Sequence, residues 1–134
     1  MLGFLFYVST YINLDLTLIL IILNFTTPIS IRYVMTNEQT ISLIFLAVAL
    51  ASQVTPTGFQ GISLIADGIN HAVPSHREMQ SSISWLIKKG IVQKIRNKYL
   101  LTEKGRIEYS STSSGLNNLH DVWKALERKI SEMT

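Results

Sequence analysis

The sequence predicts a mainly helical protein that carries one small β-hairpin. Three helix-start patterns lie in register with three helically spaced sets of apolar residues between residues 36 and 89. A short run of β-forming residues follows, interrupted by a two-residue polar turn, and another helix start comes after it. The predicted order is therefore helix, helix, helix, hairpin, helix, with one more amphipathic helix near the end of the chain.

The first helix is expected to begin at Thr36, whose hydroxyl can accept a first-turn N–H while Gln39 reaches back to complete a capping box. Its helically spaced apolar residues are Ile41, Ile44, Phe45, Val48 and Ala51. The positions between them are apolar as well, so this helix should be covered on more than one side. It should end before Pro56.

The second helix is expected to begin at Thr57, with Gln60 three residues later as its capping partner. The apolar face of this helix consists of Ile62, Ile65, Ala66 and Ile69. Pro74 should end the helical segment, because proline disfavours helical backbone at the residue before it.

The third helix is expected to begin at Ser75, which forms an S-x-x-E capping box with Glu78. Its inward-facing residues are Met79, Ile83, Leu86 and Ile87. Gly90 should end it, since glycine suits the left-handed position that follows many helices.

The hairpin is expected from two short runs, Ile91–Ile95 and Lys98–Leu101, joined by a tight turn at Arg96–Asn97. Thr102 then caps a further helix that extends to Tyr109. Three helices with a hairpin behind the third form a winged helix-turn-helix, in which the third helix is the recognition helix.

The stretch from Ile83 to Arg106 resembles the winged helix-turn-helix regulators of the MarR and PadR type. Their recognition helix ends in "L-x-x-x-G-hydrophobic-hydrophobic", followed by a charged hairpin and then "Y-x-L-T-x-x-G". The matching residues here are Leu86, Gly90, Ile91, Val92, Tyr99, Leu101, Thr102 and Gly105. At the level of the superfamily, the resemblance implies a winged helix-turn-helix domain at residues 35–110 and binding of double-stranded DNA. The wing is short, which argues against contacts in the minor groove.

Positive charge is concentrated in one block of the chain. From Arg77 to Arg106 there are eight Lys and Arg residues against two acids, a net charge of +6, so the total of +3 leaves −3 for the rest. Such a block is typical of proteins that bind polyanions. A solvated basic surface without a partner is the alternative interpretation.

The polar face of the third helix supplies the candidate contacts to base edges, and the hairpin supplies contacts to phosphates. Arginine side chains suit guanine and glutamine side chains suit adenine in the major groove. The candidate DNA-binding residues are His76, Arg77, Gln80, Ser81, Ser84, Lys88, Lys94, Arg96 and Lys98. Trp85 and Tyr99 lie in the same block, and for both of them packing is the favoured interpretation.

No pattern in the sequence indicates an enzyme, a metal site or a cofactor. The chain has no cysteine, and the three histidines, His71, His76 and His120, do not have metal-ligand spacing. We found no glycine-rich phosphate loop and no nucleophile motif.

The end of the chain is expected to be a polar linker, Ser110–Gly115, followed by a helix at residues 116–134. The apolar residues of this helix alternate at spacings of three and four, as in a helix that packs on another helix. They are Leu116, Leu119, Trp123, Leu126, Ile130 and Met133. We expect them to form a homodimer interface that pairs two DNA half-sites. Packing of this helix back onto the first helix is the alternative.

Residues 1–34 differ from the rest of the chain, because Asp15 and Arg32 are their only charges. Three interpretations remain open for this segment. Translation begins at Met35 and the upstream stretch is dispensable, the segment anchors the chain in a membrane, or it adds an element to the domain. An anchor would leave the basic domain on the cytoplasmic side.

The leading hypothesis is a DNA-binding transcriptional regulator in the cytoplasm, either free or held on the cytoplasmic face of a membrane. The alternative is a winged-helix module that binds a protein and no DNA, since this fold alone does not determine function.

Overall fold

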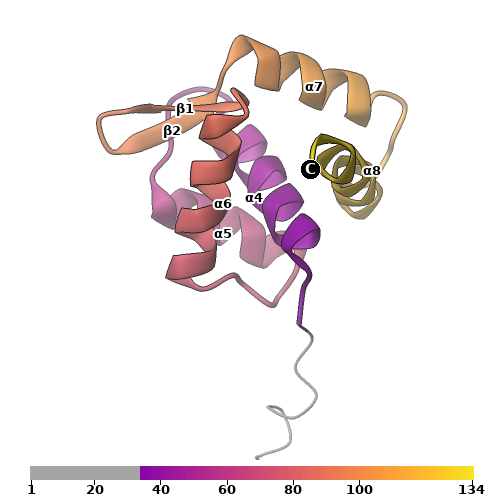
Figure 1. Cartoon of the computed structure of the whole chain (residues 1–134), viewed down its shortest axis with the longest axis horizontal. Helices are drawn as coiled ribbons and strands as arrows, with labels where there is room; N and C mark the ends of the chain where they lie inside the picture. The colour runs from indigo at the N-terminus through magenta and orange to yellow at the C-terminus, as the bar shows by residue number, and fades with distance from the viewer. Residues whose placement is uncertain (1–33) are drawn as a thin grey trace, which may run out of the picture. The chain divides into compact units, whose positions relative to one another are not determined.

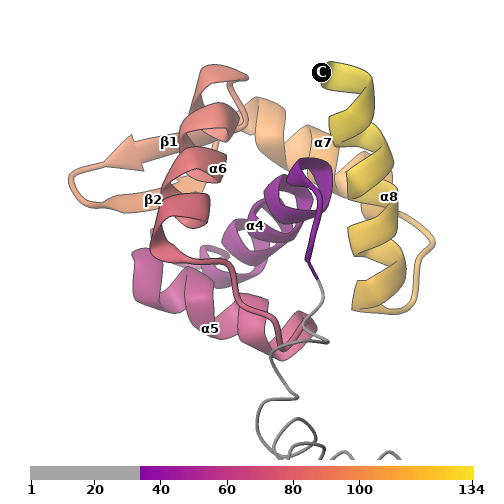
Figure 2. The same ribbon diagram turned by 60° about the horizontal axis from the view of Figure 1, so that its bottom comes forward.

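A computed structural model describes residues 34–134 as a mainly helical chain with one two-stranded antiparallel hairpin (Figures 1 and 2). In order, the elements are α4 (Asn37–Ala51), α5 (Phe59–Ile69), α6 (His76–Lys88), β1 (Val92–Ile95), β2 (Lys98–Leu101), α7 (Glu103–Ser113) and α8 (Leu119–Met133). The order of helices and strands expected from the sequence is confirmed. Residues Met35–Thr134 form one compact unit.

α4 is the central helix, and it is buried on every side. All residues from Thr40 to Ala49 are buried. α8 packs along one side of it, and α5 and α6 pack along others (Figure 2). The apolar residues all round this helix are therefore explained by a neighbour on each face. Its predicted capping box is confirmed, with Thr36 Oγ1 accepting from Gln39 N at 3.1 Å and Gln39 Oε1 accepting from Thr36 N at 2.9 Å.

α5 begins later than the sequence suggested, and the predicted capping box at Thr57 is wrong. The helix starts at Phe59 after Gly58, and no side chain caps it. The backbone of Thr57 pairs instead with Tyr99 of β2, with Thr57 N donating to Tyr99 O at 2.9 Å and Tyr99 N donating to Thr57 O at 2.7 Å. Thr57 is therefore held in extended backbone by a residue far along the chain.

Both predicted ends of α6 are confirmed. Ser75 Oγ accepts from Glu78 N at 3.1 Å, and the Glu78 carboxylate accepts from Ser75 N at 2.9 Å. At the other end, Gly90 has φ 77°, and its N–H donates to Ile87 O at 2.9 Å. The N–H of Ile91 donates to Leu86 O at 2.9 Å, which completes a Schellman motif.

The hairpin pairs β1 with β2 through four residue pairs, from Val92 with Leu101 at its base to Ile95 with Lys98 at its tip. Arg96 and Asn97 form the predicted two-residue turn. Arg96 has φ 59°, a left-handed conformation that suits glycine better than arginine.

The start of α7 fixes the base of the hairpin. The Thr102 hydroxyl accepts from Gly105 N at 2.9 Å and donates to the carbonyls of Gly90 and Ile91. A Cβ on Gly105 would collide with the carbonyl oxygen of Ile91. The Thr-x-x-Gly spacing therefore lets α7 lie directly against the chain that enters β1.

The linker predicted at Ser110–Gly115 is wrong for most of its length. α7 continues to Ser113, and only a short connection through Gly115, at φ 80°, separates it from α8. Serine and threonine are poor helix formers, but packing of α7 on α8 favours the helix here. An ion pair at 3.7 Å between Lys129 and Glu108 joins the two helices.

α8 packs back onto α4, which is the alternative that the sequence left open. Trp123, Leu126 and Ile130 are buried in the shared core. The Trp123 indole N–H lies 3.0 Å from both Gln39 O and Ser42 Oγ in the first turns of α4. The Trp123 side chain thus contributes apolar area to the core and also hydrogen-bonds to the buried Ser42 hydroxyl.

The prediction for residues 1–34 falls, apart from Val34, outside the residues that the structure describes. Within residues 34–134, no helix combines the length and apolar character needed to cross a bilayer.

Candidate nucleic-acid interface

One side of α6 is exposed along its whole length and is polar apart from Ile87, which was expected to face inward but is 38% exposed. The buried residues of this helix are Met79, Ser82, Ile83 and Leu86. The exposed candidates are His76, Arg77, Gln80, Ser81, Ser84 and Lys88. Positions 77, 80, 81, 84 and 88 follow helical spacing, so they form one continuous strip. Every candidate contact predicted on this helix therefore lies on its open face.

His76 begins α6 and belongs to a line of ring contacts between three elements. Its ring meets Phe59 of α5 edge-on at 4.9 Å, and Phe59 stacks on Tyr99 of β2 at 5.6 Å. Tyr99 is 9% exposed, so packing accounts for it. These contacts link the start of α6 to the hairpin, and Phe59 is the link that sequence reasoning missed.

The three predicted contacts on the hairpin, Lys94, Arg96 and Lys98, are all exposed. The Lys94 ammonium lies 5.9 Å from the centre of the Tyr99 ring. β1 contacts α6, and the hairpin turn projects away from that helix (Figure 1).

Three other cations of the basic block are held by backbone carbonyls. Lys89 Nζ donates to Met133 O at 3.1 Å and lies 5.3 Å from the Trp85 ring. Lys104 Nζ donates to Lys89 O at 3.0 Å. Arg106 Nη1 donates to Leu101 O at 3.3 Å. These three tie elements together, and sequence spacing alone did not separate them from the other five.

The remaining five cations form no ion pair with an acid in the described part of the chain. We call them the basic face: Arg77, Lys88, Lys94, Arg96 and Lys98. The ion pairs within residues 34–134 are His71 with Asp67 at 3.9 Å and Lys129 with Glu108 at 3.7 Å, and neither involves the basic face. A cluster of unpaired cations creates a positive potential that attracts a polyanion.

The start of α5 adds backbone donors beside the hairpin tip. Gly58 offers no side-chain cap, so no side chain accepts from the first N–H groups of this helix. A Cβ on Gly58 would lie 4.0 Å from the backbone oxygen of Asn97 in the turn. Helix N-termini of this kind favour negatively charged groups.

The residues expected to form a dimer interface lie in different environments. Trp123, Leu126 and Ile130 are buried against the chain's own core, and Met133 is half-buried. Leu116 and Leu119 are 38% and 43% exposed. Only this end of the predicted interface is open to a partner in the described arrangement.

The histidines lie beside different neighbours, namely Asp67 for His71, Phe59 for His76 and Trp123 for His120. No group of three His, Cys, Asp or Glu side chains placed to hold a metal ion occurs within residues 34–134.

Comparison of this chain with models of protein families, with curated proteins and with solved structures found no match. The functional assignment therefore depends on the geometry and charge of the basic face and the exposed strip of α6.

Proposed function

We propose that the protein is a winged helix-turn-helix transcriptional regulator that binds double-stranded DNA through α6 and the hairpin. The observation that carries the proposal is the basic face, five exposed cations without an acidic partner on a recognition-like helix and the hairpin beside it. Neutralising phosphates releases counterions, which is the main source of affinity for DNA.

In this proposal α6 lies in the major groove. Arg77, Gln80, Ser81 and Ser84 face the base edges, where arginine and glutamine can form paired hydrogen bonds with guanine and adenine. Lys88, Lys94, Arg96 and Lys98 hold phosphates, and His76 lies beside the uncapped start of α5, where a phosphate fits. The Phe59 and Tyr99 rings keep the hairpin in a fixed position relative to α6.

A salt titration of the full chain on a random-sequence duplex tests the phosphate contacts. Replacing Lys94 and Lys98 with Ala should reduce the slope of log Kobs against log salt by about 2, because each lost phosphate contact removes about one unit. The matched control is Lys124→Ala with Arg128→Ala, which removes the same charge from the exposed side of α8 and should leave the slope unchanged.

Selection of bound duplexes from a random pool tests the base contacts. Gln80→Ala should change which sequence is enriched, while the Lys94 and Lys98 variants should weaken binding about equally for all sequences. If the native chain binds no duplex at low salt, the DNA proposal is wrong. The leading function is then the second candidate, a module that binds an acidic protein surface through the same unpaired cations.

A further inference from the structure

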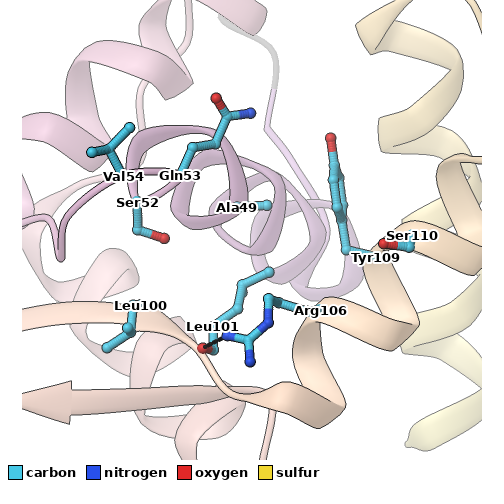
Figure 3. A pocket seen from close by; sticks show the side chains of 9 residues that line it. All are labelled: Ala49, Ser52, Gln53, Val54, Leu100, Leu101, Arg106, Tyr109 and Ser110. Atoms are coloured by element: carbon cyan, nitrogen blue, oxygen red, sulfur yellow. Dashed lines mark hydrogen bonds between the residues drawn. The ribbon is translucent and has the colours of Figure 1, made fainter.

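A pocket of about 350 Å³ opens where the end of α4, strand β2 and α7 meet (Figure 3). Figure 3 shows Arg106 reaching from α7 toward Leu101 of β2, Tyr109 on the same helix, and Gln53 just beyond the end of α4. No residue of the basic face lines this pocket, so it is separate from the proposed DNA contacts.

The floor of the pocket is aliphatic. Ala49 and Leu101 are buried there, whereas the half-buried Leu100 points away from them (Figure 3). A volume of this size matches the lower end of pockets that take small molecules. Each methylene of a ligand buried on this floor contributes favourable transfer free energy.

The rim of the pocket presents hydrogen-bond donors and one cation. The Arg106 guanidinium spends one N–H on Leu101 O, at 3.3 Å, and its other N–H groups have no partner among the described residues. The Tyr109 hydroxyl is a protonated donor at neutral pH, and burial raises the pKa of this group further above its usual 10.0. No acidic side chain lines the pocket. A cation and donors above an aliphatic floor fit a ligand with an anionic head and an apolar tail.

We propose that this pocket binds a short aliphatic carboxylate, with the head on Arg106 and the tail on Ala49 and Leu101. A guanidinium holds a carboxylate through two parallel hydrogen bonds, which no neutral head can reproduce. The proposal does not depend on DNA binding, because the pocket and the basic face share no residue.

Binding in the pocket reaches the hairpin through β2. The guanidinium that holds the carboxylate also donates to Leu101 O at 3.3 Å, so the ligand and β2 are joined through one side chain. Leu101 pairs with Val92 at the base of the hairpin. A ligand on Arg106 therefore acts on a side chain that is hydrogen-bonded to the base of the hairpin.

A titration of the ¹⁵N-labelled full chain with hexanoate, followed by amide chemical shifts, tests the proposal. We expect saturable shifts at residues 49–54, 100–101 and 106–110, with a Kd of about 1 mM, as suits a ligand this small. Arg106→Gln should raise the Kd at least about tenfold, because the charged head loses its partner. Arg128→Gln, which removes an exposed arginine from α8, should leave the Kd unchanged.

Tyr109→Phe provides a second variant that deletes only a hydroxyl, and it should weaken binding by about fivefold. Hexanamide and acetate separate the two halves of the ligand, and each should bind at least about tenfold more weakly than hexanoate. Acetate that binds as well as hexanoate would overturn the proposal, since the aliphatic floor would contribute nothing. Shifts that leave residues 49–54, 100–101 and 106–110 unchanged, or no saturable shift at all, would overturn it as well.

Discussion

Arg96 occupies the tip of the hairpin, where the backbone conformation favours glycine but a DNA contact would require a charged side chain. Its φ of 59° places an L-residue in the left-handed region, at a cost of about 1–2 kcal/mol compared with glycine. Its guanidinium is exposed at the most projecting turn of the hairpin. A strained residue that carries charge at a candidate binding surface suggests that the charge has been retained at the expense of stability.

Replacing Arg96 with Gly should therefore separate stability from affinity. We expect the free energy of unfolding to rise by about 0.5–1 kcal/mol, because relief of the left-handed strain exceeds the added entropy of the unfolded glycine. The salt slope for DNA binding should fall by about one unit. Urea denaturation and the duplex titration measure the two effects.

Arg96→Ala is the control for this pair of effects. It removes the charge but keeps a side chain at positive φ, so it should weaken DNA binding equally without the gain in stability. Equal stability of the Gly and Ala variants would contradict the assignment of strain at this turn.

At the residue scale, the exposed strip of α6 was predictable because helical spacing determines which side chains face the core. The separate roles of Lys89, Lys104 and Arg106 were not. Each of them donates to a carbonyl that only the folded chain brings close, such as Met133 O for Lys89. Charge counting in sequence treats all eight cations of the block alike.

Among the elements, α8 differs most from its sequence prediction, since it was expected to form a dimer interface and packs on α4 instead. Its apolar spacing fitted either a partner helix or α4, and the spacing is the same in both cases. The deciding contact is the Trp123 indole on Gln39 O and Ser42 Oγ. α8 is therefore a structural cover for the first described helix.

Trp123→Phe should lower the free energy of unfolding by about 1–3 kcal/mol, because it removes a donor from the buried Ser42 hydroxyl and leaves space in the core. Trp85→Phe is the matched control, since Trp85 is half-buried and its ring contact with Lys89 is at the surface. Urea denaturation monitored by far-ultraviolet circular dichroism compares the two. A larger loss for Trp85→Phe would show that α8 contributes little to the fold.

Local pattern predicted the capped starts of α4, α6 and α7, missed the cap of α8 at Asn118, where the helix was expected from residue 116, and failed where distant packing decides. The capping boxes at Thr36 and Ser75 depend on residues three apart, so a short window of sequence contains them. The capping box predicted at Thr57 does not form, because the Thr57 backbone pairs with Tyr99. The linker predicted at residues 110–113 is helical instead, because packing against α8 stabilises a helix in a segment of weak helical propensity. The pocket depends on α4 and α7 meeting, which no local pattern records.

At the scale of the whole molecule, the position of α8 limits how two copies could associate. The inward residues of the expected interface are used within the chain, and Leu116 and Leu119 remain open at the start of α8. Dimerisation stays a prediction, and it now concerns this smaller surface.

Sedimentation equilibrium of the full chain tests that surface. We expect a dimer, which Leu116→Ser with Leu119→Ser should convert to a monomer, because it removes the apolar contact without touching the core. Leu64→Ser, at an exposed apolar residue of α5, should leave the dimer intact. A native chain that sediments as a monomer at high concentration would rule the dimer out.

The burial of α4 beneath α8 also has a consequence for synthesis of the protein on the ribosome. α4 ends at Ala51, whereas α8 begins at Leu119, so the cover for its apolar surface is translated after the other described elements. At about 5–20 residues per second, roughly 3–14 seconds separate the two. During that interval α5, α6 and the hairpin can form against α4, but one side of the helix stays uncovered. The nascent chain is therefore a natural client for chaperones, and premature termination anywhere before α8 leaves a product prone to aggregation.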